Sequence, residues 1–196
     1  VVTPELLEQA RQPLNHPWFS SSAPNIVLAA GRLTYAKNFA SLLRAFSQTK
    51  DEHNSRLVIL GEGEDRAKLT ELAAQLEIDK RLFIPGFVDN PYQYMSHAKV
   101  FVLCSRWEGL PTVLIEALAC GANVISTNCP SGPAEILENG RWGTLIPVED
   151  DASLAKSLID SLTSSPQDFS STPWSRFCSS KSIDQYDKLL ESLDVI

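Results

Sequence analysis

Two glutamates with seven residues between them, Glu108 and Glu116, are the strongest candidates for chemistry in this sequence. Glu116 falls inside a helix predicted from Pro111 to Gly121, because proline suits a first helical turn and glycine a helix end. The neighbouring side chains of that helix are mostly apolar, so a carboxylate buried there needs hydrogen-bond donors. The two vicinal hydroxyls of a ribose would supply them. The alternative is a carboxylate that reaches solvent or pairs with a basic neighbour.

Two cations in the loop after the first predicted strand form a second candidate site. Arg32 and Lys37 lie in the segment Gly31-Arg32-Leu33-Thr34-Tyr35-Ala36-Lys37-Asn38. Asn38 is expected to cap a helix that starts at Phe39. A helix N-terminus offers free N–H groups and the positive end of a dipole, so two cations beside it favour an anion such as a diphosphate. Solvated surface cations are the alternative, since both residue types are common on loops.

Other acidic segments carry weaker signals. The loop Gly61-Glu62-Gly63-Glu64-Asp65-Arg66 fails the dinucleotide pattern G-x-G-x-x-G, because Arg66 stands where a small residue is needed. We interpret its carboxylates, and the cluster Glu149-Asp150-Asp151, as favourable helix starts. Glu108 and Glu116 are disfavoured as the acid and nucleophile of a glycosidase, because one precedes the helix and the other lies more than a turn inside it.

Cysteines and histidines form no pattern typical of a metal site. They are Cys104, Cys120, Cys129 and Cys178, and His16, His53 and His97. No C-x-x-C pair occurs, so we expect reduced thiols. The scattered histidines are interpreted as surface or core side chains.

Short apolar runs alternate with segments of helical period from residue 26 to residue 163. Such alternation indicates a parallel sheet with crossover helices. The predicted strands are Ile26 to Ala30, Arg56 to Leu60, Leu82 to Pro85, Val100 to Cys104, Asn123 to Thr127 and Gly143 to Pro147. Three predicted helices, each with one apolar face, contain Phe39, Leu42, Leu43 and Phe46; Leu69, Leu72, Ala73 and Leu76; and Ala155, Leu158, Ile159 and Leu162. We therefore predict an α/β fold, a Rossmann-like parallel sheet flanked by helices.

Length and composition fit one globular domain. The chain has 196 residues, of which 43% are hydrophobic and 21% charged, which allows well over half of the unfolded surface to be buried. The formal net charge is −7 and the pI is near 5.0, so nucleic acid is disfavoured as a partner. No apolar run approaches the ~20 residues of a membrane span.

The start of the sequence is typical of a piece of a longer protein. Residues 1–24 contain four prolines, so we expect an interdomain connector that is extended apart from one short helical turn. Residues 25–196 then form the domain, with a last helix around Tyr186 to Leu193. The first residue is Val1 and no signal peptide is recognisable, so we interpret the chain as a fragment.

Several motifs, in order along the chain, resemble those of one enzyme family. They are Gly31-Arg32-Leu33 with Lys37-Asn38-Phe39, Leu60-Gly61-Glu62-Gly63, Gly86-Phe87-Val88, and Glu108-Gly109-Leu110-Pro111 with Glu116-Ala117-Leu118. Together they resemble the C-terminal, donor-binding domain of GT-B-fold, family-four retaining glycosyltransferases, also called glycosyl transferases group 1. The E-x7-E spacing is the most specific part. The resemblance implies one half of a GT-B fold that binds a nucleoside diphosphate sugar.

The resemblance also implies a role for each matching residue. Arg32 and Lys37 would hold the diphosphate, Glu108 the hydroxyls of the donor sugar, Glu116 the ribose, and the backbone near Val88 the base. The catalytic residues of this half would be Arg32, Lys37 and Glu108. The residues that bind the nucleotide sugar would be Gly31, Arg32, Lys37, Val88, Glu108, Gly109, Leu110, Thr112 and Glu116.

No metal and no cofactor are implied, because in this family cationic side chains and helix N–H groups neutralise the leaving diphosphate. The sequence also contains no D-x-D signature. The segments Asn90-Pro91-Tyr92 and Cys129 to Leu137 look like those of bacterial polysaccharide and glycolipid enzymes. This similarity favours a UDP-linked donor sugar.

The expected partners beyond the nucleotide sugar are an N-terminal acceptor-binding domain of the same protein and a glycan or lipid-linked acceptor. By family analogy that domain carries a catalytic histidine, so the isolated chain is expected not to transfer sugar. The implied location is cytoplasmic, peripheral on the inner face of the membrane through the other domain. The alternatives are a GT-B-like epimerase or phosphorylase, against which E-x7-E argues, and a non-catalytic nucleotide-binding module.

Overall fold

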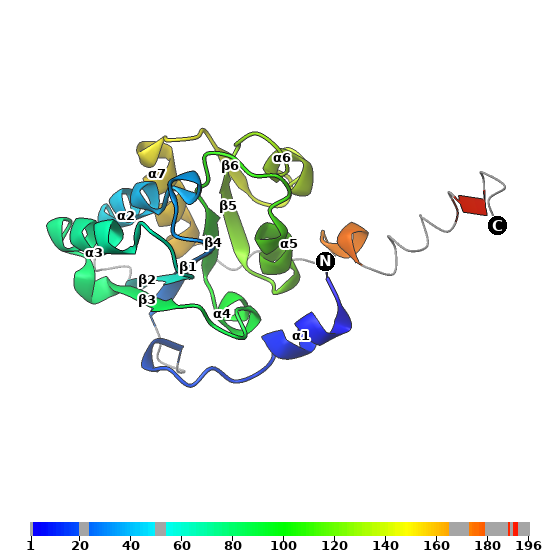
Figure 1. Cartoon of the computed structure of the whole chain (residues 1–196), viewed down its shortest axis with the longest axis horizontal. Coiled ribbons are helices and arrows are strands. Elements are labelled where there is room, and N and C mark those ends of the chain that lie inside the picture. Colours follow the sequence, from blue (N-terminus) through cyan, green and yellow to red (C-terminus); the bar gives the residue numbers. More distant parts are fainter. Residues whose placement is uncertain are drawn as a thin grey trace.

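The computed structural model describes residues 2–19, 24–49, 54–164, 173–178, 188 and 190–191. Within these ranges six parallel strands form one sheet in the order β3-β2-β1-β4-β5-β6 (Figure 1). The strands are β1 (Asn25–Ala30), β2 (Ser55–Leu60), β3 (Leu82–Gly86), β4 (Val100–Leu103), β5 (Asn123–Thr127) and β6 (Thr144–Ile146). All six predicted strands are confirmed, each end within a residue of its predicted position.

The helices predicted around Phe39, Leu69 and Leu158, and the helix predicted from Pro111, are also confirmed. The helices of the described chain are α1 (Pro4–Ala10), α2 (Phe39–Ser47), α3 (Arg66–Gln75), α4 (Tyr92–Ser96), α5 (Thr112–Ala119), α6 (Pro133–Ile136) and α7 (Asp151–Thr163). Short 3-10 turns are η1 (Pro17–Phe19), η2 (Tyr35–Lys37), η4 (Asp79–Arg81) and η5 (Ser175–Phe177). The helix expected around Tyr186 to Leu193 falls mostly outside the described residues.

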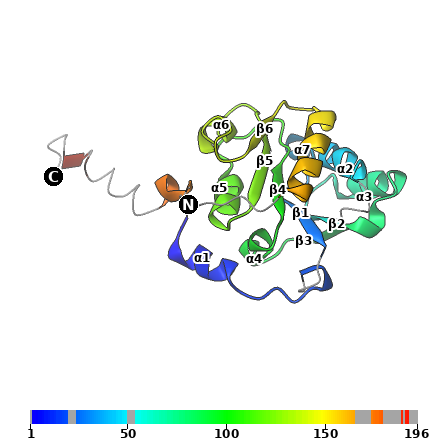
Figure 2. The same cartoon turned by 180° about the vertical axis from the view of Figure 1, so that it is seen from behind.

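Helices cover both faces of the sheet, because successive strand residues point to opposite faces. In β1, Val27 and Ala29 belong to the core under α2, α3 and α7. Ile26 and Leu28 belong to the core under α4, α5 and α6. Figures 1 and 2 show these two helical layers on opposite sides of the strands. The strands are therefore buried on both sides, which explains why they are continuous apolar runs in the sequence.

The order of the strands creates a switch point between β1 and β4. These two strands are neighbours, with Val27 beside Val100 and Leu28 beside Phe101, but the chain continues from β1 to one side and from β4 to the other. In such doubly wound sheets the loops leaving the two strands separate and open a crevice at their carboxyl ends. The loops that carry Arg32 and Glu108 are the two loops concerned.

The N-terminal segment differs from the extended connector that its prolines suggested. Pro4 begins the seven-residue helix α1, where proline is tolerated because the first N–H groups of a helix have no acceptor within it. Thr3 Oγ1 caps this helix by accepting a hydrogen bond from Leu6 N at 3.3 Å. Helix α1 packs against α4, and Phe19 of η1 is buried in the core. The prolines therefore delimit short helices that rest on the domain. A connecting role for residues 1–24 stays a prediction.

Candidate functional site

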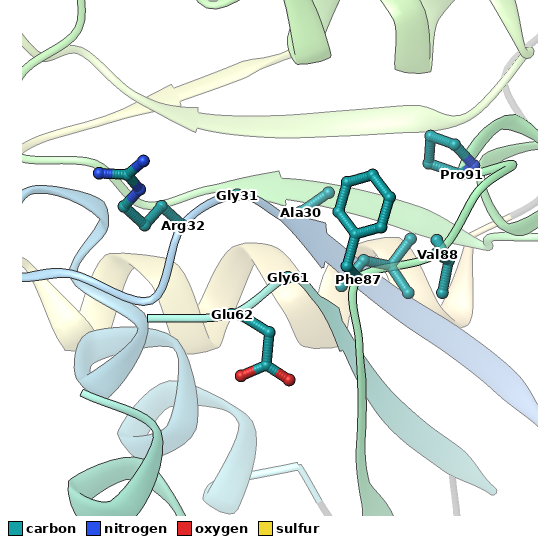
Figure 3. A pocket seen from close by; sticks show the side chains of 9 residues that line it. Ala30, Gly31, Arg32, Gly61, Glu62, Phe87, Val88 and Pro91 are labelled. Carbon is teal, nitrogen blue, oxygen red and sulfur yellow. The ribbon is translucent and has the colours of Figure 1, made fainter. Parts of the chain in front are cut away.

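Two cavities lie over the carboxyl ends of the strands and share Ala30, Gly31, Arg32 and Pro91. The first, of about 370 Å³, is also lined by Leu60, Gly61, Glu62, Phe87 and Val88 (Figure 3). The second, of about 280 Å³, is also lined by Lys37, Met95, Glu108, Leu110, Pro111, Thr112, Val113 and Glu116. Because the two share a wall, we describe them together as the cleft. It lies at the switch point of the sheet.

Two glycines let the loops after β1 and β2 touch at the floor of the cleft. The backbone φ of Gly61 is +129°, and a Cβ there would lie 2.1 Å from the carbonyl oxygen of Gly31. Gly31 N donates to Leu60 O at 2.9 Å, and Gly61 N donates to Gly86 O at 2.8 Å. Any side chain at Gly61 would push the first loop away, so the glycine fixes the position from which Arg32 projects.

The turn η2 places Lys37 beside the loop that follows β4. Lys37 Nζ lies 2.5 Å from Glu108 Oε1, and Ser105 Oγ donates to the same oxygen at 2.6 Å. The backbone holds the two loops together, since Arg106 N donates to Ala36 O at 2.8 Å. The Glu108 side chain is only 10% exposed, so the ion pair and the hydroxyl satisfy a carboxylate that water reaches poorly.

Arg32 is exposed and lines both cavities. Among the described residues, no acidic side chain lies within ion-pair distance of its guanidinium. Figure 3 shows the side chain reaching away from Gly31 at the margin of the cleft. A guanidinium matches the geometry of phosphate oxygens, so Arg32 is available to an anionic ligand without the competing carboxylate with which Lys37 pairs.

Glu116 lies on α5, half-buried, and lines the second cavity. Burial raises its pKa above the ordinary value of 4.5, because a desolvated carboxylate disfavours its charged form. Burial, and then the charge of Glu116, raise the pKa of the Tyr92 phenol. No side chain in the described ranges forms an ion pair or a hydrogen bond with the Glu116 carboxylate. The described residues therefore do not support the alternative in which Glu116 pairs with a basic side chain.

Asn38 does not cap α2 as expected. It occupies the residue before the helix, but its backbone is left-handed (φ 51°, ψ 38°) and its side chain makes no capping hydrogen bond. Asparagine is among the few residues that adopt this conformation at low cost. The role of Asn38 is thus to turn the chain from η2 into α2.

The interpretation of the carboxylates in the loop from Gly61 to Arg66 as a helix start is not confirmed. Helix α3 has no acidic residue in its first turn. Glu62 instead lines the cleft and accepts from Arg66 NH1 at 2.7 Å. The interpretation is confirmed for Asp150, which accepts from Ser153 N at 2.9 Å at the start of α7. Glu149 pairs with Arg106 at 2.7 Å.

The structure brings nearly all of the residues assigned from the resemblance to one place. Those that line the cleft are Gly31, Arg32, Lys37, Val88, Glu108, Leu110, Thr112 and Glu116. Gly109 is not among the lining residues. Sequence reasoning missed Pro91, Met95 and Phe87 as parts of the walls. Phe87, 82% exposed, was detectable as an aromatic residue directly after a strand end.

The remaining chemistry-bearing side chains form no second centre in the described part of the chain. The four cysteines are free thiols, and burial raises the pKa of Cys104 to about 12. No group of three or more histidine, cysteine or acidic side chains is arranged to hold a metal ion there. Nor do the described residues include a helix that is both long and apolar enough to span a bilayer.

A doubly wound parallel sheet with a cleft over its switch point defines an α/β protein of the class that binds ligands at the carboxyl ends of its strands. The comparison with known families is more specific. The model of the family Glycosyl transferases group 1 matches residues 13–171, and the chain belongs to this family. The resemblance drawn from the motifs is confirmed.

Curated relatives are glycosyltransferases. An uncharacterized glycosyltransferase of Methanocaldococcus jannaschii is 41% identical over 113 residues, which cover 57% of this chain and 28% of that protein. An N-acetylgalactosamine-N,N'-diacetylbacillosaminyl-diphospho-undecaprenol 4-alpha-N-acetylgalactosaminyltransferase of Campylobacter jejuni is 37% identical over 132 residues, or 67% of this chain and 36% of that protein. The match thus spans only about a third of the length of these relatives.

Solved structures confirm the Rossmann-like half of a GT-B fold. The lipopolysaccharide outer core galactosyltransferase WaaB aligns with a TM-score of 0.76 at 23% identity, over 88% of this chain and 50% of that one. The pneumococcal O-GlcNAc transferase GtfA in complex with UDP and GlcNAc aligns with a TM-score of 0.73 at 23% identity, over 86% and 36%.

Proposed function

We propose that this chain is the donor-binding half of a metal-independent, retaining glycosyltransferase, and that the cleft holds a nucleoside diphosphate sugar with UDP as the nucleotide. One observation carries the proposal. Two cations, Arg32 and Lys37, and both glutamates of the E-x7-E motif line a single cleft at the switch point of the sheet. Anionic diphosphate and hydroxyl-rich sugars are the ligand chemistry that such a set of groups fits.

The diphosphate is assigned to the cationic side of the cleft. Arg32 is exposed and has no acidic partner in the described chain, so a phosphate can bind there without breaking an ion pair. Lys37 has three donors and uses at least one on Glu108, which leaves others for phosphate oxygens. Glu108, held by Lys37 and Ser105, is oriented to accept hydrogen bonds from the hydroxyls of the donor sugar.

The nucleoside is assigned to the remaining walls. Glu116 is a carboxylate without a described partner, and the ribose hydroxyls would supply the donors that it lacks. The base would lie near the backbone of Val88, in the first cavity. A UDP donor is supported by the family and by the UDP named in the structures of pneumococcal GtfA and Anabaena HepE.

In the reaction, the bond between the sugar anomeric carbon and the diphosphate oxygen breaks, and the electron pair leaves with the diphosphate. Arg32 and Lys37 would stabilise this charge, which is the role of a metal ion in other enzymes. The acceptor hydroxyl then bonds to the anomeric carbon on the face that the diphosphate leaves, and its proton passes to an oxygen of the departing diphosphate. We propose a glycan or lipid-linked acceptor, reached at the cytoplasmic face of a membrane. The undecaprenol-linked substrate named for the Campylobacter relative supports that choice.

Calorimetric titration with UDP, with and without a chelator, tests this proposal. We expect the same affinity in both cases, because side chains supply the positive charge. Binding that requires magnesium or manganese would contradict the metal-independent site. Absence of binding under both conditions would contradict the proposal as a whole.

A further inference from the structure

One wall of the cleft depends on a very short helix. Pro91 lines both cavities and Met95 lines the second. Both lie in or next to α4, which has five residues. Isolated helices shorter than ~12 residues are marginal in water. Tertiary contacts must therefore decide where this wall stands.

Asn90 supplies such contacts at the start of α4. Its Oδ1 accepts from Tyr92 N at 3.1 Å, and its Nδ2 donates to Gln9 O and to Gln12 Oε1, each at 3.0 Å. The main-chain partners favour this orientation of the amide, because a flipped amide would set Oδ1 against Gln9 O and Nδ2 against Tyr92 N. Asn90 thus joins the first turn of α4 to the last turn of α1.

A second tie lies at the other end of α4. Ser96 Oγ donates to Ala10 O at 2.7 Å. Gln9 and Ala10 are in the last turn of α1, where main-chain carbonyls have free acceptor capacity and accept side-chain donors readily. Both ends of α4 are therefore attached to a segment that lies some 80 positions earlier in the sequence. Figures 1 and 2 show α1 alongside α4 in both views.

We propose that Asn90 is a positioning residue for the nucleotide: it fixes α4, and with it the wall formed by Pro91 and Met95, by anchoring α4 to the N-terminal segment. The inference rests on the proposed nucleotide function of the cleft. Its consequence is that the N-terminal segment tunes nucleotide affinity without touching the ligand. A displacement of α1 would loosen the wall formed by α4, but would leave the cations on the other loops in place.

Asn90→Asp tests this role, because it retains the oxygen that caps α4 and removes both donors to α1. Loss of one or two net hydrogen bonds predicts about a threefold to tenfold weaker UDP affinity by calorimetry. Affinity for inorganic pyrophosphate, assigned to Arg32 and Lys37, should change less than about twofold. Amide hydrogen exchange of residues 92–96 should become faster. Ser96→Ala, a milder change at the other tie, should shift UDP affinity in the same direction.

Asn123→Asp is the matched control. Asn123 Nδ2 donates to Lys99 O at 3.3 Å, at the opposite end of the sheet, so this variant should bind UDP as the parent chain does. Parent-like UDP affinity in both Asn90→Asp and Ser96→Ala would overturn the inference while leaving the nucleotide site intact. Equal losses for UDP and pyrophosphate would reduce Asn90 to a general structural role. Failure of the parent chain to bind UDP would overturn both proposals.

Discussion

Glu116→Gln is the substitution that best separates ribose binding from a structural role. The carboxylate is half-buried and its pKa is raised by desolvation, so its charge opposes folding of the ligand-free domain. Among the described residues no side chain forms an ion pair with Glu116, so the substitution leaves none of their charges unpaired. Removing the charge keeps the shape of the side chain and relieves that cost. We therefore expect an unchanged or higher melting temperature at neutral pH.

The same substitution should weaken nucleotide binding. Hydrogen bonds to a charged acceptor contribute about 1.5–3 kcal/mol, which corresponds to about a tenfold to hundredfold loss of UDP affinity. Calorimetry and thermal unfolding should be measured on one preparation of the variant. Glu71→Gln, on the exposed side of α3, is the matched control and should change neither quantity.

The opposite pattern would refute the assignment. Parent-like UDP affinity together with a large fall in melting temperature would mean that Glu116 serves the fold. The pH profile offers an independent check. Because the folded pKa of Glu116 is raised, its contribution to stability is complete below the ordinary value of 4.5 and is lost as pH rises through the folded value. Glu116→Gln should remove that loss, and Glu71→Gln should retain it.

Two further substitutions test how the cleft is built. Lys37→Met leaves the nearly buried Glu108 carboxylate without its cation, so urea unfolding should show a free energy of unfolding lower by about 1–3 kcal/mol. The double variant with Glu108→Gln should regain most of that stability but not the affinity for UDP. Gly61→Ala should lower the free energy of unfolding by about 3 kcal/mol or more, because its methyl group meets the Gly31 carbonyl. The control Gly121→Ala, also at positive φ but with open space around it, should lower it by about 1–2 kcal/mol. Equal losses in the two variants would contradict the close contact between the loops at the floor of the cleft.

The sequence was sufficient to locate the strands and the main helices. Parallel strands buried on both faces are short apolar runs, and the helices between them have one apolar face, so both signals are local. The N-terminal segment shows the limit of such signals. Its prolines exclude a long helix, but they do not reveal that Leu6 and Phe19 are buried against the domain. That burial depends on contacts with α4, which are distant in sequence.

The sequence predicted the individual residues of the site better than their arrangement in space. Motifs indicated Arg32, Lys37, Glu108 and Glu116, and all four line the cleft. The ion pair of Lys37 with Glu108 was not predicted, because it requires β1 and β4 to be adjacent, and hydrophobic periodicity does not determine strand order. Pro91 and Met95 were missed for a similar reason, since their positions are set by the ties of α4 to α1.

Two carboxylates in a cleft proposed for a diphosphate would repel the ligand if both carried an uncompensated charge beside the phosphates. The structure resolves this conflict differently for each. Lys37 neutralises Glu108 locally, and Ser105 donates a hydrogen bond to the same carboxylate. Lys37 therefore positions the group proposed to bind the sugar hydroxyls and keeps further donors for phosphate. Glu116 lies on the helix that follows, where burial already disfavours its charge. Arg32, free of any described acid, is then the group that gives the cleft its attraction for an anion.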